Sequence, residues 1–162
     1  MPATSDQGRS MTDSNQPIPP RRRIRLSVAD CIIDAERVSP DLAEIVSVPS
    51  PDTGLSYRDI VQLGCQQSDD RYPIQAIHQR SAMTTYCVEI HAAQPEHLSE
   101  LQRMIAILGG RCEDWTGTLI DDASDWYPDR LVGIALTGRQ QLQTILTAWA
   151  RQHSPASWFE SE

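Results

Sequence analysis

Lysine is absent from the sequence: all 14 basic residues are arginines, and 22 acidic residues outnumber them. Without lysine, the chain has no side chain for Schiff-base chemistry and no P-loop lysine. The formal net charge of -8 argues against a general nucleic-acid-binding protein, because phosphate contacts need a cationic surface. We therefore expect no nucleic-acid partner.

Long apolar runs are absent as well. No stretch approaches the roughly 20 apolar residues that span a bilayer, and the polar N-terminus lacks the apolar core of a signal peptide. The Arg21–Arg25 region is followed by SVADCIIDAER, whose three acidic residues exclude the apolar segment of a twin-arginine signal. We expect a cytoplasmic protein that makes no membrane contact.

Closely spaced cysteine pairs are missing too. The four cysteines are Cys31, Cys65, Cys87 and Cys112. Their wide separation in a cytosolic chain predicts small buried hydrophobic residues and no disulfide framework. Strand alternation places Cys87, Glu89 and His91 on one face, with Cys112 at the start of a neighbouring strand, but no close pair has structural-zinc spacing. We predict no metal site.

Motifs for nucleophilic catalysis are also absent. The sequence has no GxSxG, no glycine-rich phosphate loop, and no serine or cysteine marked out by a local motif. The carboxylate pairs Asp69–Asp70 and Glu113–Asp114 are sequence neighbours, which need not point into one cleft. The acidic segment 121–129 fits no EF-hand and favours a solvated loop over a calcium site. We predict no catalytic residue, no cofactor and a non-enzymatic protein.

The first part of the chain has weak periodicity. Residues 1–22 are rich in Ser, Asp, Gln and Pro, which predicts a disordered tail. The basic end of this tail is either a solvated leader or an interaction arm. Residues 23–83 are interpreted as an extension that wraps the second half, or as a small α+β subdomain. Within them, RIRLSV alternates apolar and polar residues and predicts a strand.

Two further elements are expected before residue 84. Ser56 and Asp59 have a capping-box-like spacing, which predicts a short helix that follows Ser56 and ends near Gly64. The segment 71–79 predicts another strand, and Pro73 places it at a sheet edge.

Residues 84–162 have clear periodicity. The expected elements follow the order β-α-β-β-α-(β) and cover 84–92, 95–110, 113–120, 130–138, 139–152 and 156–160. Core positions of the two helices are Leu98, Leu101, Ile105, Leu142, Ile145, Leu146 and Trp149. Each helix has one apolar stripe, so both must cover one face of an antiparallel sheet. The predicted fold class is α+β and ferredoxin-like, with an N-terminal extension or subdomain.

The spacing of Leu98, Leu101, Ile105, Gly109 and Cys112 resembles the first helix and second strand of ACT domains, which are regulatory modules that bind amino acids and similar effectors. Pro95 and Leu98 match the turn of that family, whereas Glu96 stands near the family's glycine. The resemblance covers residues 84–162. It implies that an effector would meet a loop made of Gln94, Pro95, Glu96, His97 and Leu98.

A shorter stretch, LGGRCEDWTGTLID, is similar to the RraB family of ribonuclease E inhibitors. In that family a helix runs into a glycine, acidic residues and a tryptophan-bearing strand. The resemblance implies an acidic protein that acts by binding another protein. This chain departs from the family because it continues with another strand and helix.

These patterns together favour a regulatory or protein-interaction module that binds a partner protein. The expected partner-binding residues are the aromatics Trp115, Trp126, Tyr127 and Trp158. The sheet face opposite the helices, with its free edges, also offers a surface for a homodimer. The alternatives are an effector-sensing domain, an inhibitor of a ribonuclease, and a small enzyme with a pocket between the two halves.

Overall fold

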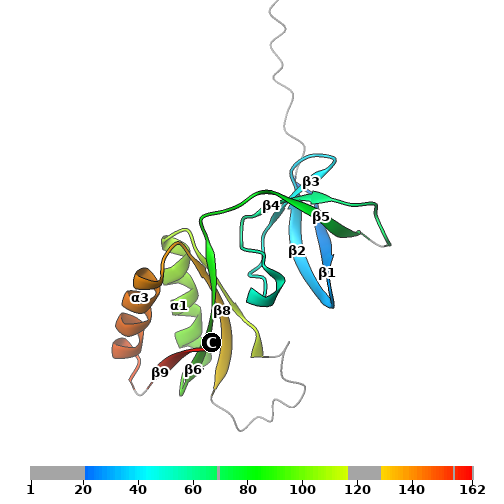
Figure 1. The fold of residues 1–162 in the computed structure, drawn as a ribbon. Helices are drawn as coiled ribbons and strands as arrows, with labels where there is room; N and C mark the ends of the chain where they lie inside the picture. Colours follow the sequence, from blue (N-terminus) through cyan, green and yellow to red (C-terminus); the bar gives the residue numbers. More distant parts are fainter. Residues whose placement is uncertain (1–20, 69, 117–128, 155, 162) are drawn as a thin grey trace, which may run out of the picture.

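Alternating apolar residues form short strands in the first half of the chain. The computed structural model describes residues 21–68, 70–116, 129–154 and 156–161. The first-half elements are β1 (Arg23–Val28), β2 (Cys31–Arg37), β3 (Leu42–Ile45), the 3-10 turn η1 (Pro51–Thr53), β4 (Ile60–Leu63) and β5 (Arg71–Gln79). Consecutive strands pair antiparallel and β5 returns to pair with β1 in parallel, so the strands close into a barrel (Figure 1).

The barrel interior is filled by alternate residues of its strands. Successive side chains of a strand point to opposite faces, so one face of each strand lies inside. Ile33 and Ala35 are buried, while Ile32 and Asp34 between and beside them are exposed. The other buried members of this cluster are Ile24, Leu26, Ala43, Ile45, Leu55, Val61, Leu63 and Tyr72. The first half therefore has a hydrophobic core of its own.

The helix predicted after Ser56 is absent, and that prediction is wrong. The Asp59 carboxylate does accept a hydrogen bond from the Ser56 N–H at 3.0 Å, as in a capping box. However, Arg58 has a left-handed backbone with φ 68°, which ends any helical turn, and the chain then enters β4. Val61 of β4 is fully buried in the barrel, so burial outweighs the local capping signal.

β5 is a strand as predicted, but its predicted place at a sheet edge is wrong. It pairs with β4 on one side and with β1 on the other, because the barrel closes there. Pro73 stands opposite Ser27 at the last pair of the short parallel ladder. Its missing N–H therefore costs no hydrogen bond in a long ladder.

Strands and helices alternate in the second half. The elements are β6 (Thr84–His91), α1 (Pro95–Ile107), β7 (Arg111–Asp114), β8 (Arg130–Leu136), α3 (Arg139–Gln152) and β9 (Ser157–Ser161). The sheet has the order β7-β8-β6-β9 with antiparallel pairing throughout. Both helices lie on the same side of this sheet (Figure 1). No helix of the described residues has the length and apolarity needed to cross a membrane.

The core of the second half lies between this sheet and the two helices. Leu98, Leu101 and Ile105 of α1 are buried, as their spacing predicts. From α3, the buried residues are Leu142, Ile145, Leu146 and Trp149. The Trp149 indole N–H donates to the His97 carbonyl at 2.8 Å. This bond ties the end of α3 to the start of α1.

Two glycines make the turn from α1 into β7. Gly109 follows the helix with φ 76°, a left-handed conformation that ends many helices. At Gly110, a Cβ atom would lie 2.5 Å from the Ala135 carbonyl oxygen of β8, so no side chain fits. The prediction that the glycine pair allows the turn into the next strand is confirmed at Gly109.

The predicted fold class is wrong for this chain. An open ferredoxin-like sandwich with an extension or subdomain does not describe it, because residues 23–79 form a closed five-stranded barrel beside a second sheet. The α+β class itself holds, since the described residues contain two sets of strands and the helices α1 and α3. The barrel was not predicted because its strands are only four to nine residues long. Closure of the barrel also depends on pairing between segments that are far apart in sequence.

Candidate functional site

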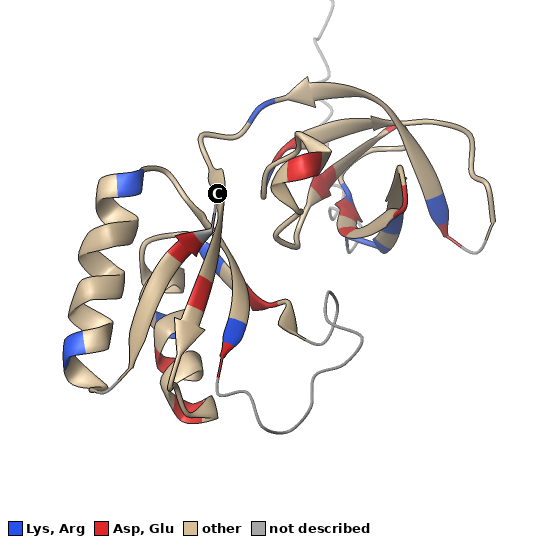
Figure 2. Cartoon of the chain, turned by 60° about the horizontal axis from the view of Figure 1, so that its bottom comes forward, with Lys and Arg blue, Asp and Glu red and all other residues tan. Residues whose placement is uncertain are grey.

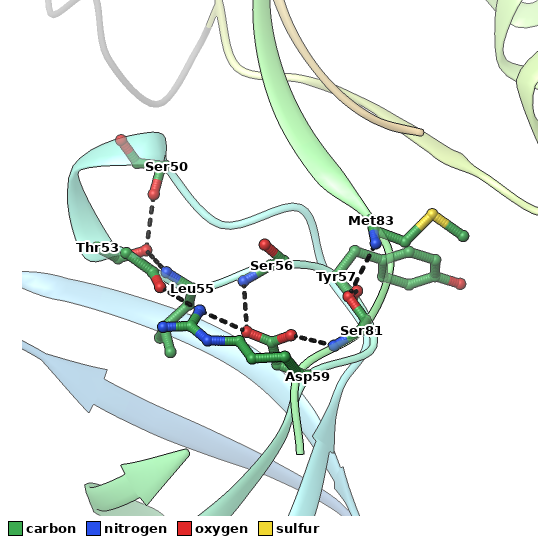
Figure 3. Close-up of polar contacts among 10 residues, drawn as sticks. Ser50, Thr53, Leu55, Ser56, Tyr57, Asp59, Ser81 and Met83 are labelled. Atoms are coloured by element: carbon green, nitrogen blue, oxygen red, sulfur yellow. Dashed lines mark hydrogen bonds and ion pairs between the residues drawn. The ribbon is translucent and has the colours of Figure 1, made fainter. Parts of the chain in front are cut away.

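A buried carboxylate joins the barrel to the sheet (Figure 3). Asp59, directly before β4, has no exposed surface. Its Oδ1 accepts the Ser81 N–H at 2.7 Å, and its Oδ2 accepts the Ser56 N–H at 3.0 Å. The Arg80 guanidinium donates to the same Oδ2 at 3.1 Å. Because Arg80 and Ser81 connect β5 to β6, Asp59 sets the path of the chain from the barrel to the sheet.

The residues around Asp59 add further hydrogen bonds to this connection. The Ser81 hydroxyl donates to the Tyr57 carbonyl at 2.7 Å and accepts the Met83 N–H at 3.2 Å. Arg80 also donates to the Gly54 carbonyl at 2.6 Å. A buried charge is stable only when its hydrogen-bonding capacity is used, and here both carboxylate oxygens have donors.

The barrel also contacts the sheet directly. Val48 and Pro49, which follow β3, are buried. The Val48 N–H donates to Glu113 Oε2 of β7 at 3.0 Å, and the other oxygen of this carboxylate accepts from the Arg111 guanidinium. Glu113 thus bridges the edge strand of the sheet and the segment that leaves the barrel.

A cleft of about 570 Å³ lies beside this bridge. Barrel residues 30–34 and 47–50 form one wall, and residues 113–115 form the other. The lining contains four carboxylates and no cationic side chain; the carboxylates are those of Asp30, Asp34, Glu113 and Asp114. Figure 2 shows acidic positions on strands of both units. Ile32, in the barrel wall, is 49% exposed, so the cleft combines negative charge with an accessible apolar side chain.

Trp115, one of the predicted partner-binding aromatics, lies in this lining. The backbone N–H of Trp115 donates to the Leu131 carbonyl at 2.8 Å, which continues the pairing of β7 with β8. The indole ring packs flat against the backbone at Gly133, where a Cβ atom would come within 2.0 Å of the ring. The glycine therefore makes the space that lets Trp115 lie on the sheet while remaining half-exposed.

The carboxylates of the two walls differ in their partners. Burial raises the pKa of Asp114, but hydrogen bonds from the Thr116 side chain and backbone and the bond and charge of Arg130 outweigh it, so the pKa is lowered. Arg130 Nη1 donates to Asp114 Oδ2 at 2.6 Å. Asp30 and Asp34 are exposed and form no ion pair among the described residues. The barrel wall therefore carries the uncompensated negative charge.

Trp158, another of the predicted partner-binding aromatics, does not line this cleft. Trp158 stands opposite Ile90 in β9 and packs half-buried against the core under the helices. Trp126 and Tyr127 lie outside the described residues. The neighbouring Phe159 is 61% exposed on the other face of β9, with its ring 5.3 Å from that of His91. Of the two predicted aromatics that the structure describes, Trp115 lies in the cleft lining and Trp158 does not.

The five residues assigned to an effector loop form the start of α1, away from the cleft lining. Gln94, Pro95 and Glu96 are exposed, whereas Leu98 is buried in the core. His97 Nδ1 accepts the Gln94 N–H at 3.2 Å. The His97 ring stacks on His153 with 4.2 Å between centroids. His97 and Leu98 are therefore engaged in packing, and effector binding by this loop stays a prediction.

Cys87, His91 and Cys112 do not meet in space. Cys112 is buried under the helices, and burial, followed by the charges of Asp114 and Glu113, raises its pKa to about 12. Cys87 and His91 lie on the opposite face of the sheet, and His91 Nδ1 is 2.6 Å from Asp129 Oδ1. No group of three metal-ligating side chains occurs in the described ranges.

Neither of these thiols suits nucleophilic chemistry. Burial, followed by the negative charges of Glu89 and Asp52, raises the pKa of Cys87. The thiolate is the reactive form of cysteine, and a raised pKa depletes it. These two cysteines therefore behave as small side chains of the sheet.

Two arginines of the basic Arg21–Arg25 region form ion pairs on the outer surface of the barrel. Arg21 forms an ion pair with Glu44 of β3, and Arg22 forms one with Asp70 at 2.7 Å. Both arginines are largely exposed, so these pairs contribute little stability but orient the chain entering β1. The predicted disordered tail, apart from Arg21 and Arg22, lies outside the described residues.

The strand β2, which forms the barrel wall of the cleft, was not predicted from the sequence. CIIDAER alternates exposed and buried residues, with Ile33 and Ala35 inside the barrel and Ile32 and Asp34 outside. That alternation is present in the amino-acid sequence and predicts a strand. The adjacent pair Ile32–Ile33 obscures it, because either isoleucine fits the core face.

Comparisons with known proteins give little further information. No protein-family model matches the chain, and no curated protein sequence matches it. One solved structure, described as a hypothetical protein from Neisseria gonorrhoeae, has 13% identity to this chain and a TM-score of 0.39. The match covers 86% of this chain and 93% of that one. A likeness this remote supports no argument about fold or function.

Proposed function

We propose that this protein is a non-enzymatic regulator that acts by binding a partner protein in the cleft between the barrel and the sheet. The observation that carries the proposal is a cleft lined by residues of both units, in which Ile32 is 49% exposed beside Trp115 and four carboxylates. Accessible apolar groups bordered by charged ones are typical of protein-binding surfaces. Trp115 supplies the kind of aromatic anchor that often dominates binding energy.

The connection between the two units supports a preformed binding surface. Two carboxylates join the barrel to the sheet by hydrogen bonds. Asp59 accepts from Ser56 and Ser81, and Glu113 accepts from Val48. A surface that is already ordered loses less conformational entropy when a partner binds. This arrangement favours recognition of a partner.

The proposal also places the protein in the cytoplasm. Cys31 and Cys65 are exposed and free, and Cys31 lies in the cleft lining. Exposed free thiols are compatible with a reducing compartment, whereas oxidising compartments promote disulfides.

Affinity capture from native lysate tests the proposed function. The wild type is compared with Ile32→Glu in the cleft and with Ile107→Glu at the end of α1, where the side chain is 72% exposed. Both changes replace an exposed isoleucine, so neither disturbs a core. We expect the wild type and Ile107→Glu to recover the same stoichiometric partner, and Ile32→Glu to lose it.

Two results contradict this function. Equal capture by Ile32→Glu would show that the cleft is not the binding surface. A rise in melting temperature with free amino acids or nucleotides, without recovery of any partner, would support the effector-sensing alternative, because a ligand that binds the native state stabilises it.

A further inference from the structure

The barrel wall of the cleft contains a stretch of strand edge that the barrel itself does not cover. β2 pairs with β3 only over Ala35–Arg37. One step further, the Val46 N–H still donates to the Asp34 carbonyl at 3.0 Å, and the Asp34 N–H donates to the Ser47 hydroxyl at 3.1 Å. By the same register, the next residue opposite β2 would be Val48, facing Ile32. Val48 instead turns away and donates its N–H to Glu113 of the sheet.

The backbone of Ile32 consequently points into this uncovered space. Backbone groups of an antiparallel strand alternate between its two neighbours. The Arg37 N–H donates to the Arg22 carbonyl on the β1 side, whereas the Asp34 groups bond on the β3 side. Ile32 has the parity of Asp34, so its N–H and C=O face away from β1, and no hydrogen bond among the described residues engages them.

The opposite wall is a strand edge too. β7 pairs only with β8 and ends the sheet. The Trp115 N–H bonds toward β8, so the N–H and C=O of Asp114, one residue earlier, point outward. An extended chain in the cleft would therefore run between two strand edges, which is the arrangement that adds a strand.

Charge in the cleft selects the chain that fits there. Ile32 and Asp34 share the outward face of β2, because Ile33 and Ala35 point into the barrel core. Asp30 lines the same cleft from the turn directly before β2. An incoming strand would present alternate side chains to this face. An apolar side chain opposite Ile32, flanked two residues away by cationic side chains, would match the two unpaired carboxylates.

We propose that the cleft binds an extended cationic segment of a partner protein, which adds as a strand to β2 at Ile32 and places Arg or Lys side chains beside Asp30 and Asp34. This inference rests on the proposed function and specifies the partner's chemistry. Main-chain hydrogen bonds to Ile32 supply the register. The carboxylates reject acidic segments, because like charges held close together disfavour binding.

Synthetic peptides test this inference on the full chain. The probe is an acetylated, fluorescently labelled heptapeptide of sequence TRTVTRT, whose arginines flank the valine on one face of a strand. Its matched controls are TETVTET and TRTVTRT with an N-methyl group on the valine. Binding is followed by fluorescence anisotropy for the wild type, for the double variant Asp30→Asn/Asp34→Asn, and for Asp52→Asn as an exposed acidic control outside the lining.

We expect TRTVTRT to bind the wild type and Asp52→Asn alike, with binding that weakens as salt increases. The N-methyl group and the double variant should each weaken binding about tenfold, through loss of a main-chain hydrogen bond and of two charges respectively. In amide hydrogen exchange, TRTVTRT should slow exchange at Ile32, whereas Ile33, already paired with Leu26, should not change.

Absence of TRTVTRT binding, equal binding of TETVTET, or unchanged exchange at Ile32 would each overturn the inference. If Ile32→Glu abolishes capture of the cellular partner but the peptide criteria fail, a partner binds the cleft in another way. The proposed function then survives and this inference does not. If Ile32→Glu leaves capture intact, the proposed function fails first.

Discussion

The barrel buries its aliphatic side chains behind a closed ring of strands, whereas the second sheet buries one face under α1 and α3. Closure pairs nearly every strand of the barrel on both sides. The sheet instead keeps two edge strands, β7 and β9, and a face without a described helix. Open hydrogen-bonding groups are therefore expected along the two edges of the sheet. In the barrel they occur where a ladder is short, as between β1 and β5 and beside β2 at Ile32.

This difference shows why the cleft is a distinctive place in the molecule. The pairing of β2 with β3 stops short of Ile32, because Val48 turns away from β2 and donates its N–H to Glu113. The contact that joins the two units is thus also the one that opens the strand edge. The two architectures meet where each has unpaired backbone, and this junction carries the proposed site.

Removal of the Trp149 side chain should have the largest effect on the second half. The side chain is fully buried in the core of the second half and its indole N–H bonds to the His97 carbonyl. Trp149→Ala should lower the free energy of unfolding of this half by about 4 kcal/mol, from lost burial and a residual cavity. Chemical denaturation followed by far-UV circular dichroism measures the loss.

The same variant shows whether the barrel depends on the sheet. Hydrogen exchange at Leu26, in the barrel core, should keep its wild-type protection, because the two halves have separate hydrophobic clusters. Ile107→Ala, at an exposed position, is the control and should change stability by less than about 0.5 kcal/mol. Equal loss of protection in the barrel would mean that the chain unfolds as one unit.

Asp59→Asn should have the next largest effect, at the connection between the barrel and the sheet. The amide would place an NH₂ group against a buried N–H donor of Ser56 or Ser81. We expect a loss of about 3 kcal/mol in the free energy of unfolding, because a partly buried N–H donor is left without an acceptor and the buried carboxylate loses its ion pair with the exposed Arg80. Thermal and urea unfolding measure it.

Asp52→Asn provides the matched control for this connection. Asp52 is exposed on η1, close to Asp59 in sequence, and its replacement should leave stability within about 0.5 kcal/mol of the wild type. Similar losses in both variants would argue that negative charge in this region, rather than the buried hydrogen bonds, matters.

The smallest expected effect concerns the sheet wall of the cleft. The pKa of Asp114 is lowered in the folded protein, so the native state binds this proton less readily than the unfolded state. Its contribution is therefore fully present above the ordinary value of 3.8 and is lost as pH falls through the folded-state pKa. Asp114→Asn should cost less than about 1 kcal/mol at neutral pH, since the pair with Arg130 is partly exposed.

Stability curves against pH for the wild type and Asp114→Asn provide the measurement. The two curves should converge in acid, where both side chains are uncharged. A gap that stays constant down to acid pH would mean that Asp114 acts through packing and not through its charge.

Local periodicity in the sequence predicts most elements of the second half and their buried faces, but the strand expected over 113–120 is β7 at Arg111–Asp114. Leu98, Leu101 and Ile105 repeat with the period of a helix, and Val88 and Ile90 repeat with the period of a strand. These periods depend only on backbone geometry within a few residues. The same local reasoning located β1 and β5, but it assigned a helix where Arg58 and the barrel core impose β4.

Tertiary structure alone decided the barrel, the role of Asp59 and the cleft. Barrel closure requires β1 to meet β5, and the Asp59 carboxylate becomes a junction only once Ser81 returns to it. Ile32 and Ile33 are the same residue type, yet strand register points Ile32 outward and Ile33 into the barrel core. Such outcomes depend on contacts between distant segments, which no periodicity within a short stretch can specify.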